Sequence, residues 1–563
     1  MVFFDYAFAA IPMLGILVFV HEFGHFIVAK LCGVRVLRFS LGFGSPIGFG
    51  NHRLRWERGG TEYVVAWVPL GGFVRMLGQS IPGEGGGEDP EPVDVRPDEY
   101  LESKPVWQKI AITVAGPLMN LVLPVLIFMV MLWVGIPKVT SVVGMVERES
   151  PAAEVGLRPG DEIVAIDGEP VRWWSEVDRQ IREHQGEEVE LTVLRGDESL
   201  EIEVPRGARS ALDEFGDAES IGWVGLGSQR LPALVGIPQA DSLAGQSGLR
   251  SGDRVIEVQG ESVEDWEDFL SAYEGSQGQT YVDLTVESGK EDELEQRSVR
   301  VPVVEALDQL GVISATVLVG EVVAGMPAEA AGLAPGDLIL EVNGRSAGSF
   351  RNFADTVRSS GGRSLEIVYA REGEVIRTSI APVVREVAGP FEIDGMESEI
   401  YQVGIAHAMA TLPGHLGVDR ERNPLVALPR AIAMTADNVG LLLQGLGKLV
   451  TGQVGTDQLR GPITIVQIAR KSLDIGWQAY LGMMIFISIN LAIVNLLPIP
   501  ILDGGQLMIY VIEGIKRSPL SLRTREWVYQ FGFILIVMMM GLAFWNDLSG
   551  QWAKFVTWLG LEL

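Results

Sequence analysis

The sequence is poor in cysteine and in charge, and each shortage excludes a class of protein. Its one cysteine, Cys32, cannot form a disulfide within the chain, so any exported part has to be stable without one. Only 21% of the 563 residues are charged and 47% are apolar, which is too apolar for an ordinary soluble multidomain protein. The formal net charge of -29 argues against nucleic-acid binding. The N-terminus also lacks a basic start, so we expect a retained first membrane span and no cleavable signal peptide.

Four apolar runs are long enough to cross a bilayer, which takes roughly 20 residues. They cover residues 7–31, 110–136, 477–497 and 528–545. The sequence therefore predicts a multi-pass α-helical membrane protein with about four transmembrane helices. Residues 424–472 are also apolar, but Pro429 and charged side chains interrupt them. We expect amphipathic helices on the outer membrane surface there.

The orientation follows from the short loops, because Lys and Arg concentrate in cytoplasmic loops. Basic residues flank the segment between the first two spans and fill the loop between the last two; they are Arg35, Arg38, Arg96, Lys104, Lys516, Arg517, Arg523 and Arg525. Both segments should be cytoplasmic. The termini and the long segment between the second and third spans should then face the periplasm of a bacterial inner membrane.

That long segment contains a threefold repeat. Residues 152–171, 243–263 and 327–347 share Gly-Leu-x-x-Gly-Asp, an apolar strand and a turn that ends in glycine. In the third copy the pattern predicts a helix over 349–360 and a strand over 364–370. The repeat resembles the PDZ domain in its bacterial strand order, which implies α+β modules that bind extended peptides as an added strand. The alternative is that some copies, the middle one above all, only space the structure.

These patterns predict a chain of six parts. They are a first membrane part at 1–136, PDZ-like domains at 137–206, 207–306 and 307–388, an amphipathic helical region at 389–476, and a second membrane part at 477–563.

The first span contains His21-Glu22-Phe23-Gly24-His25, which fits His-Glu-x-x-His. On a helix this spacing puts the two imidazoles one turn apart on one face, where they can bind one zinc ion with Glu22 near a bound water. Ionisable side chains at membrane depth are costly and are rare without a function. The alternative is a pair of histidines satisfied in a helical core with Glu22 as their partner.

A catalytic zinc usually has three protein ligands and keeps its fourth position for water. The other histidines, His52, His184, His407 and His415, all lie outside the predicted spans. Asp503 follows the third span on the same side of the bilayer as the C-terminal half of the first, so its carboxylate can meet His21 and His25. Alternatively, Asp503 is a helix N-cap, and the two roles are compatible.

Nearly the whole chain resembles the site-2 protease family of intramembrane zinc metalloproteases, and most closely its bacterial members that regulate sigma-E. The resemblance is carried by HEFGH at 21–25, AGPLMN at 115–120, LRGPITIVQ at 459–467, and the pattern of Asn495, Pro498, Pro500, Asp503 and Gly504. It implies that His21, His25 and Asp503 bind zinc and that Glu22 activates water. It also implies that Asn495, and less directly Asn490, bind the substrate strand, although helix-helix hydrogen bonding is the alternative for both. Asn120 we assign to packing or to support of the site.

The resemblance further implies that residues 37–44 and 61–77 form a re-entrant β-hairpin, with a cytoplasmic hairpin resting on the membrane as the alternative. Residues 80–99 form a Gly-, Pro- and acid-rich loop to which we assign no chemistry.

The leading hypothesis is an inner-membrane zinc protease that cuts single-span membrane proteins within the bilayer, as in regulated intramembrane proteolysis. Anti-sigma factors of the sigma-E stress response and remnant signal peptides are the implied substrates, with peptide ligands at the PDZ-like modules and the lipid bilayer around the spans. The family's best-known members have two such modules, whereas this chain has three. A membrane-anchored PDZ scaffold with a structural or degenerate metal site is the alternative, and Glu22 speaks against it. A third hypothesis, a zinc carrier, would need polar residues in several spans, and the second and fourth predicted spans have few.

Overall fold

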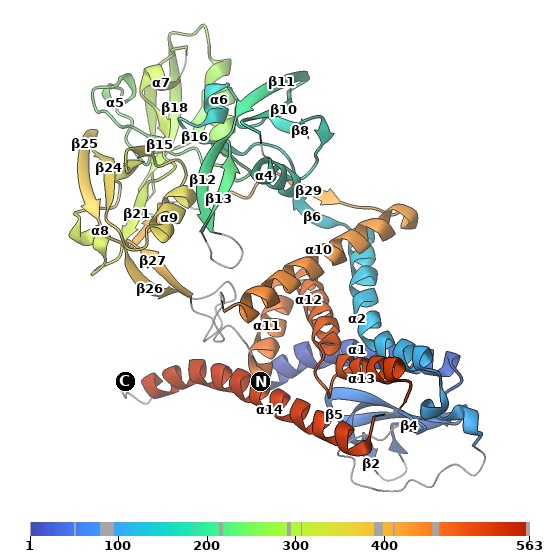
Figure 1. The fold of residues 1–563 in the computed structure, drawn as a ribbon. Coiled ribbons are helices and arrows are strands. Elements are labelled where there is room, and N and C mark those ends of the chain that lie inside the picture. Colours follow the sequence, from blue (N-terminus) through green and yellow to red (C-terminus); the bar gives the residue numbers. More distant parts are fainter. Residues whose placement is uncertain are drawn as a thin grey trace. The chain divides into compact units, whose positions relative to one another are not determined.

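The structure is a computed structural model that describes residues 2–49, 52–78, 95–184, 186–212, 218–289, 294–305, 307–387, 398–408, 411–452, 461–518 and 520–558. It divides into two compact units, which are described separately below. The first includes Met1–Ile136 and Arg420–Leu563, and the second includes Pro137–Val387 and Ser398–Asp419. Long helices make up most of the first unit, whereas strands dominate the second (Figure 1).

The first unit is built from long apolar helices. Five helices of the described chain are long and apolar enough to cross a membrane: α1 (Val2–Leu31), α2 (Val106–Val134), α10 (Pro424–Val450), α12 (Trp477–Leu496) and α14 (Leu522–Trp558). Two shorter helices, α11 (Pro462–Ile475) and α13 (Asp503–Lys516), complete the unit. The multi-pass helical architecture predicted from the sequence is therefore present.

The predicted number of about four spans needs correction, because α10 is a fifth candidate. The sequence-based count left it out on account of Pro429 and its charged neighbours. Pro429 stands in the second turn of a helix that begins at Pro424, and the helix continues through it to Val450 although a proline there lacks the amide proton for one backbone bond. The side-chain amide of Asn438 also donates to the carbonyl of Met434 within the same helix. The interruptions are thus compatible with one continuous helix.

α1 ends where Gly33 takes a left-handed backbone conformation, with φ of 70°. The amide of Val34 then bonds the carbonyl of Ala29 at 2.9 Å, which closes the last turn of the helix. Gly24 brings α1 close to α2, since a Cβ atom at this position would lie 2.3 Å from the carbonyl oxygen of Ala115. The two helices can therefore pack backbone to backbone beside the HEFGH stretch.

A small sheet follows α1, in the order β1 (Val36–Pro46), β5 (Thr61–Met76) and β4 (Arg55–Arg58). β5 is long and bent, so β1 pairs with both of its halves: Leu41 lies opposite Val65 on one side and Gly72 on the other. The two stretches predicted to form strands do form them. A Cβ atom at Gly72 would meet the side chains of Val18 and Glu22, so the second half of β5 packs on α1 beside Glu22.

In the second unit, each repeat forms a four-stranded antiparallel sheet with one helix. The strand orders are β11-β10-β8-β9, β17-β16-β18-β19 and β23-β22-β24-β25. The strands are β8 (Glu162–Ile166), β9 (Glu169–Pro170), β10 (Glu188–Arg195), β11 (Glu198–Pro205), β16 (Arg254–Val258), β17 (Glu261–Ser262), β18 (Tyr281–Ser288), β19 (Glu295–Pro302), β22 (Leu338–Val342), β23 (Arg345–Ser346), β24 (Leu365–Arg371) and β25 (Glu374–Ile380). The helices are α4 (Trp174–Glu183), α6 (Trp266–Gly275) and α9 (Phe350–Ser359). The helix and strand predicted at 349–360 and 364–370 are confirmed by α9 and β24.

The aspartate of each Gly-Leu-x-x-Gly-Asp repeat is buried, which explains the repeated pattern. In the third copy Asp337 accepts from Nε of Arg371 at 2.7 Å and from the amide of Ala334 at 2.8 Å. The same arginine donates to the carbonyl of Gly332, whose φ is 79°. A buried carboxylate needs such partners. Equivalent pairs are Asp161 with Arg195 and Asp253 with Arg297.

Each sheet module is closed by a strand from beyond its repeat. β14 (Leu226–Gly227) pairs with β7 (Met145–Val146), β20 (Ile313–Ser314) with β15 (Val235–Gly236), and β28 (Ile405–His407) with β21 (Val319–Val322). Residues 226–227 were assigned to the second predicted domain, yet Val224 and Leu226 pack in the core of the first module. The repeat marks the middle of a module and not its end.

Shorter elements complete the described chain. They are β2 (Gly48–Phe49), β3 (His52–Arg53), η1 (Pro97–Glu99), η2 (Leu101–Ser103), β6 (Ile136–Val139), α3 (Pro151–Glu154), β12 (Gly207–Leu212), β13 (Ala218–Trp223), α5 (Leu243–Gln246), α7 (Leu307–Leu310), α8 (Pro327–Ala330), β26 (Val383–Val387), β27 (Ser398–Gln402) and β29 (Leu416–Asp419). Most of the predicted acidic loop at 80–99 lies outside the described residues.

Candidate metal centre

His21 and His25 lie one turn apart on α1, and both rings turn toward the start of α13. Their Nε2 atoms are 3.3 Å apart. Asp503, the first residue of α13, places one carboxylate oxygen 3.2 Å from Nε2 of His21 and the other 3.5 Å from Nε2 of His25. The structure thus brings together three side chains that stand at opposite ends of the sequence.

These distances suit a single zinc ion. Bonds of about 2.0–2.1 Å put two ligand atoms of a tetrahedral zinc site roughly 3.3 Å apart. Among the described residues, His21, His25 and Asp503 form the one group of three or more His, Cys, Asp or Glu side chains whose ligand atoms all lie within 4.8 Å of one another. Two imidazole nitrogens and one carboxylate also leave the fourth position of a catalytic zinc to water.

The turn between α12 and α13 holds Asp503 in place. Pro498 and Pro500 stop α12 from continuing, since proline lacks the amide proton that a helix needs. The glycines after Asp503 then fit tightly: a Cβ atom at Gly504 would lie 2.2 Å from the carbonyl oxygen of Leu497. This close packing explains why glycine follows the aspartate.

α2 supports both histidines from behind. Nδ1 of His25 donates to the carbonyl of Ile112 at 2.8 Å. The side-chain amide of Asn120, which is fully buried, lies 3.3 Å from Nδ1 of His21. Between them, a Cβ atom at Gly116 would come within 2.2 Å of the His25 ring. From the sequence we expected Asn120 to serve packing or support of the site, but nothing in the sequence pointed to the Ile112 carbonyl.

Glu22 lies between the histidines and the sheet. A Cβ atom at Gly72 would lie 3.1 Å from Cγ of Glu22, so this side chain lies against β5. The backbone of Val74 in β5 hydrogen-bonds the Glu22 carboxylate. Asn490 and Asn495 are on α12, where Asn490 is exposed and Asn495 half-buried. Their substrate role stays a prediction.

Three of the four other histidines that were considered as ligands have surroundings of their own. His184 pairs with Asp167 at 3.0 Å, His407 lies 3.0 Å from the carbonyl of Thr316, and His415 lies 3.6 Å from Glu267. All three belong to the second unit. Among the described residues, none of the three belongs to a group of side chains placed to share a metal ion.

The comparison with known proteins identifies the family. The chain matches peptidase family M50 over residues 9–539. The chain belongs to peptidase family M50. It is 30% identical to "Regulator of sigma-E protease RseP" of Escherichia coli over 545 residues, which cover 96% of this chain and 97% of that one. It is 31% identical to "Protease RseP" of Yersinia pestis over 547 residues, with 96% and 98% covered.

A relative in Neisseria meningitidis, whose name includes the words zinc metalloprotease, is 30% identical over 546 residues, or 95% of this chain and 96% of its own. The predicted site-2 type of zinc metalloprotease is therefore confirmed. This M50 peptidase uses zinc, and the His21, His25 and Asp503 cluster has the composition and spacing to hold it.

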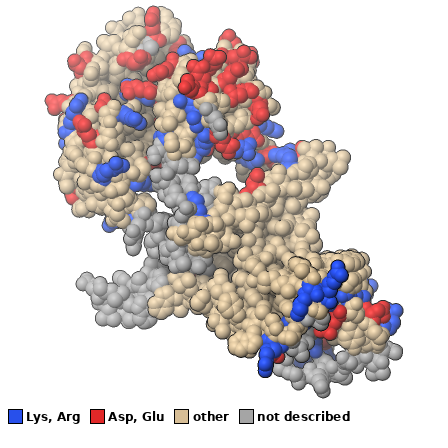
Figure 2. Space-filling model, in the orientation of Figure 1, with Lys and Arg blue, Asp and Glu red and all other residues tan. Residues whose placement is uncertain are grey.

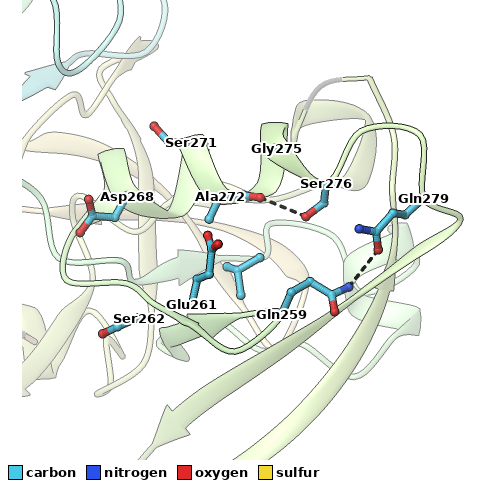
Figure 3. A pocket seen from close by; sticks show the side chains of 10 residues that line it. Gln259, Glu261, Ser262, Asp268, Ser271, Ala272, Gly275, Ser276 and Gln279 are labelled. Atoms are coloured by element: carbon cyan, nitrogen blue, oxygen red, sulfur yellow. Dashed lines mark hydrogen bonds between the residues drawn. The ribbon is translucent and has the colours of Figure 1, made fainter.

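A separate hollow lies on the second sheet module, between the β16–β17 turn and α6 (Figure 3). Its volume is roughly 460 Å³, and polar side chains line it. Gln259 donates to Gln279 at 3.2 Å, and Ser276 donates to the carbonyl of Ala272 at 3.0 Å. We assign no function to this hollow.

Proposed function

We propose that His21, His25 and Asp503 hold the zinc ion and that Glu22 is the general base of peptide-bond hydrolysis. The convergence of two imidazole nitrogens and one carboxylate, at the spacing of a tetrahedral zinc site, carries the proposal. A purely structural site would not need Glu22 beside its ligands.

Each side chain then has a defined task. Zinc held by His21, His25 and Asp503 would polarise the scissile carbonyl and would acidify a water so that it could attack near neutral pH. Glu22 takes the proton from this water and passes it to the leaving amine. Asn495 and Asn490 on α12 bind the backbone groups that an unwound substrate exposes.

A transmembrane substrate has to lose its helix before its carbonyls can react. Residues 71–76 of β5 lie beside Glu22 and pair with β1 along one edge. No other described strand pairs with this half of β5. We propose that the sheet is re-entrant and that this open edge takes the extended substrate as an added strand.

The substrates we propose are single-span membrane proteins, namely anti-sigma factors or remnant signal peptides. Relatives with the name regulator of sigma-E protease match this chain over almost their full length, and this supports the proposed class of substrates. We place the enzyme in a bacterial inner membrane with the metal centre toward the cytoplasm. In Figure 2, Lys and Arg gather on the part of the first unit around the β1–β5–β4 sheet, which agrees with the rule that cytoplasmic segments are basic.

The three sheet modules we interpret as periplasmic PDZ-like domains. Their shared strand order and the short closing strands support this. The extended strand beside each helix is a site where a peptide can be added. Three modules in a row give this chain one more than the family's best-known members.

The test uses the purified full chain in detergent with a tagged single-span substrate. Glu22→Gln should retain one zinc per chain but lose cleavage at least about a hundredfold, since a positioned base contributes roughly 10²–10⁴-fold. His21→Ala and Asp503→Ala should lose both zinc and cleavage. Zinc is measured by atomic emission and cleavage by the size of the tagged product.

Glu57→Gln makes the same change at an exposed glutamate of β4 and serves as the control. It should cut at the rate of the unaltered enzyme. Cleavage by Glu22→Gln at the normal rate would refute the assignment of the base. Zinc binding by the unaltered chain without cleavage of any candidate substrate would favour the scaffold alternative.

A further inference from the structure

One face of α2 lies behind the two histidines. Ile112, Gly116 and Asn120 follow one another at intervals of four residues, so they share that face. The carbonyl of Ile112 reaches Nδ1 of His25, and the amide of Asn120 reaches Nδ1 of His21. Each histidine therefore meets α2 with Nδ1 and faces Asp503 with Nε2.

The Ile112 contact determines where His25 carries its proton. A carbonyl oxygen can only accept a hydrogen bond, so Nδ1 of His25 has to be the donor. The lone pair of Nε2 is then available for a cation. For His21 to use Nε2 in the same way, its Nδ1 must also carry the proton and must find an acceptor.

Asn120 can provide that acceptor only through its oxygen. As placed, Nδ2 of Asn120 faces Nδ1 of His21, while its Oδ1 is buried and has no hydrogen-bond partner among the described residues. A side-chain NH₂ group donates and cannot accept. Oxygen and nitrogen of an amide are similar in size, so a half-turn of the amide places Oδ1 on His21 and Nδ2 where Oδ1 stood.

We infer that Asn120 is a positioning residue of the zinc site: its Oδ1 accepts a hydrogen bond from Nδ1 of His21 and keeps the Nε2 lone pair directed at the metal. The inference rests on the proposed role of His21 as a zinc ligand. Partners of this kind, which orient a ligand without touching the metal, typically change metal affinity by about 10–100-fold when removed.

A purely structural role for Asn120 can be separated from this one. The hydroxyl of Ser488 on α12 donates to the backbone carbonyl of Asn120 at 2.7 Å and so links α12 to α2. This bond does not involve the side chain of Asn120. Ser488→Ala therefore removes the helix contact at the same residue and leaves the amide in place.

The experiment measures zinc affinity of the full chain in detergent by competition with a chelator of known affinity. Asn120→Leu keeps the size but has no acceptor, and its zinc affinity should fall by about 10–100-fold. Asn120→Asp presents an oxygen in either orientation and should bind zinc at least as tightly as the unaltered chain. Ser488→Ala should bind zinc within about twofold of the unaltered chain, even where its thermal stability falls.

Three outcomes would overturn the inference: unchanged affinity in Asn120→Leu, an equal loss in Asn120→Leu and Asn120→Asp, or an equal loss in Ser488→Ala and Asn120→Leu. His21→Ala distinguishes this failure from failure of the proposed site. If His21→Ala loses zinc but Asn120→Leu binds it with normal affinity, only the proposed role of Asn120 is wrong. If His21→Ala still binds zinc normally, the proposed zinc site itself is wrong.

Discussion

At the scale of single residues, glycines decide how closely α2 approaches the histidines. A side chain at Gly116 would occupy the space of the His25 ring, because its Cβ atom would lie 2.2 Å from Nε2 and 2.6 Å from Cε1. A Cβ atom at Gly24 would lie 2.3 Å from the carbonyl oxygen of Ala115, so glycine at this position allows the backbones of α1 and α2 to meet. The small residues of the AGPLMN stretch thus belong to the geometry of the metal centre.

Gly116→Ala should displace the His25 ring and lower zinc affinity at least about tenfold, an effect similar to the loss of an orienting partner. Chelator competition measures the affinity. Gly15→Ala is the matched control in α1, since a Cβ atom there meets nothing within 4 Å. It should bind zinc normally. Normal zinc affinity in Gly116→Ala would contradict the close fit of His25 against α2.

At the scale of helices, α14 provides the cap that α11 lacks. The N-cap residue of α11 is Gly461, which has no side chain to bond the first amides. Asp547 of α14 takes that role with a buried carboxylate. It accepts from the amides of Gly461 and Ile463 at 2.9 and 3.0 Å and from the hydroxyl of Thr464 at 2.7 Å. The contact joins the LRGPITIVQ stretch to the last helix.

Asp547→Ala should destabilise this contact by about 2 kcal/mol, because several buried donors lose their acceptor. Hydrogen exchange followed by mass spectrometry should show faster exchange at the first amides of α11. Asp474→Ala is the control at the other end of the helix, where Asp474 forms an exposed pair with Arg470 at 2.5 Å. Such pairs contribute only about 0.3–0.5 kcal/mol. Equal exchange in both variants would disprove the cap.

At the scale of the whole molecule, the second unit is held together by contacts between modules. Leu234 and Leu318 pack with Leu338 where the second and third modules meet. Glu147 follows β7 of the first module and is hydrogen-bonded by Asn352 of α9 in the third. Arg209 bonds the same asparagine and lies 3.6 Å from Glu147. The three repeats therefore form one unit and not a string of separate modules.

Burial raises the pKa of Glu147 above its ordinary value of 4.5, although the Asn352 amide and the charge of Arg209 act to lower it. The folded chain therefore binds a proton more tightly here than the unfolded chain does. The resulting stability is fully present below about pH 4.5 and is lost as the pH rises through the folded pKa.

Glu147→Gln resembles the protonated carboxyl at every pH, so it should unfold at a higher temperature than the unaltered chain at pH 7–8. The difference should vanish below about pH 4.5. Thermal unfolding of the full chain, followed by tryptophan fluorescence over a pH series, measures it. Glu321→Gln changes an exposed glutamate of the same unit as a control. A pH-independent difference would contradict the raised pKa.

Much of the protein can be predicted from local sequence. Four of the five long apolar helices, the strands beside α1 and the threefold repeat follow from runs and periods, because each depends on residues close together in the chain. The His-Glu-x-x-His spacing likewise places two imidazoles on one helix face. α10 was missed as a candidate span because polar residues and a proline weaken a composition signal without breaking a helix.

Contacts between distant segments had to come from the tertiary structure. The sequence placed Asp503 at a matching depth in the bilayer, and packing of α1, α2 and α13 brought its oxygens within 3.2 and 3.5 Å of the two histidines. No local signature predicts the bond to the Ile112 carbonyl, the burial of Oδ1 of Asn120, the cap by Asp547 or the closing strands of the modules. The sequence alone determined which helices form and which residues can bind zinc, because helix periodicity and ligand chemistry are local properties. Only the fold decided which groups meet, because a hydrogen bond across helices depends on close packing between residues far apart in the chain.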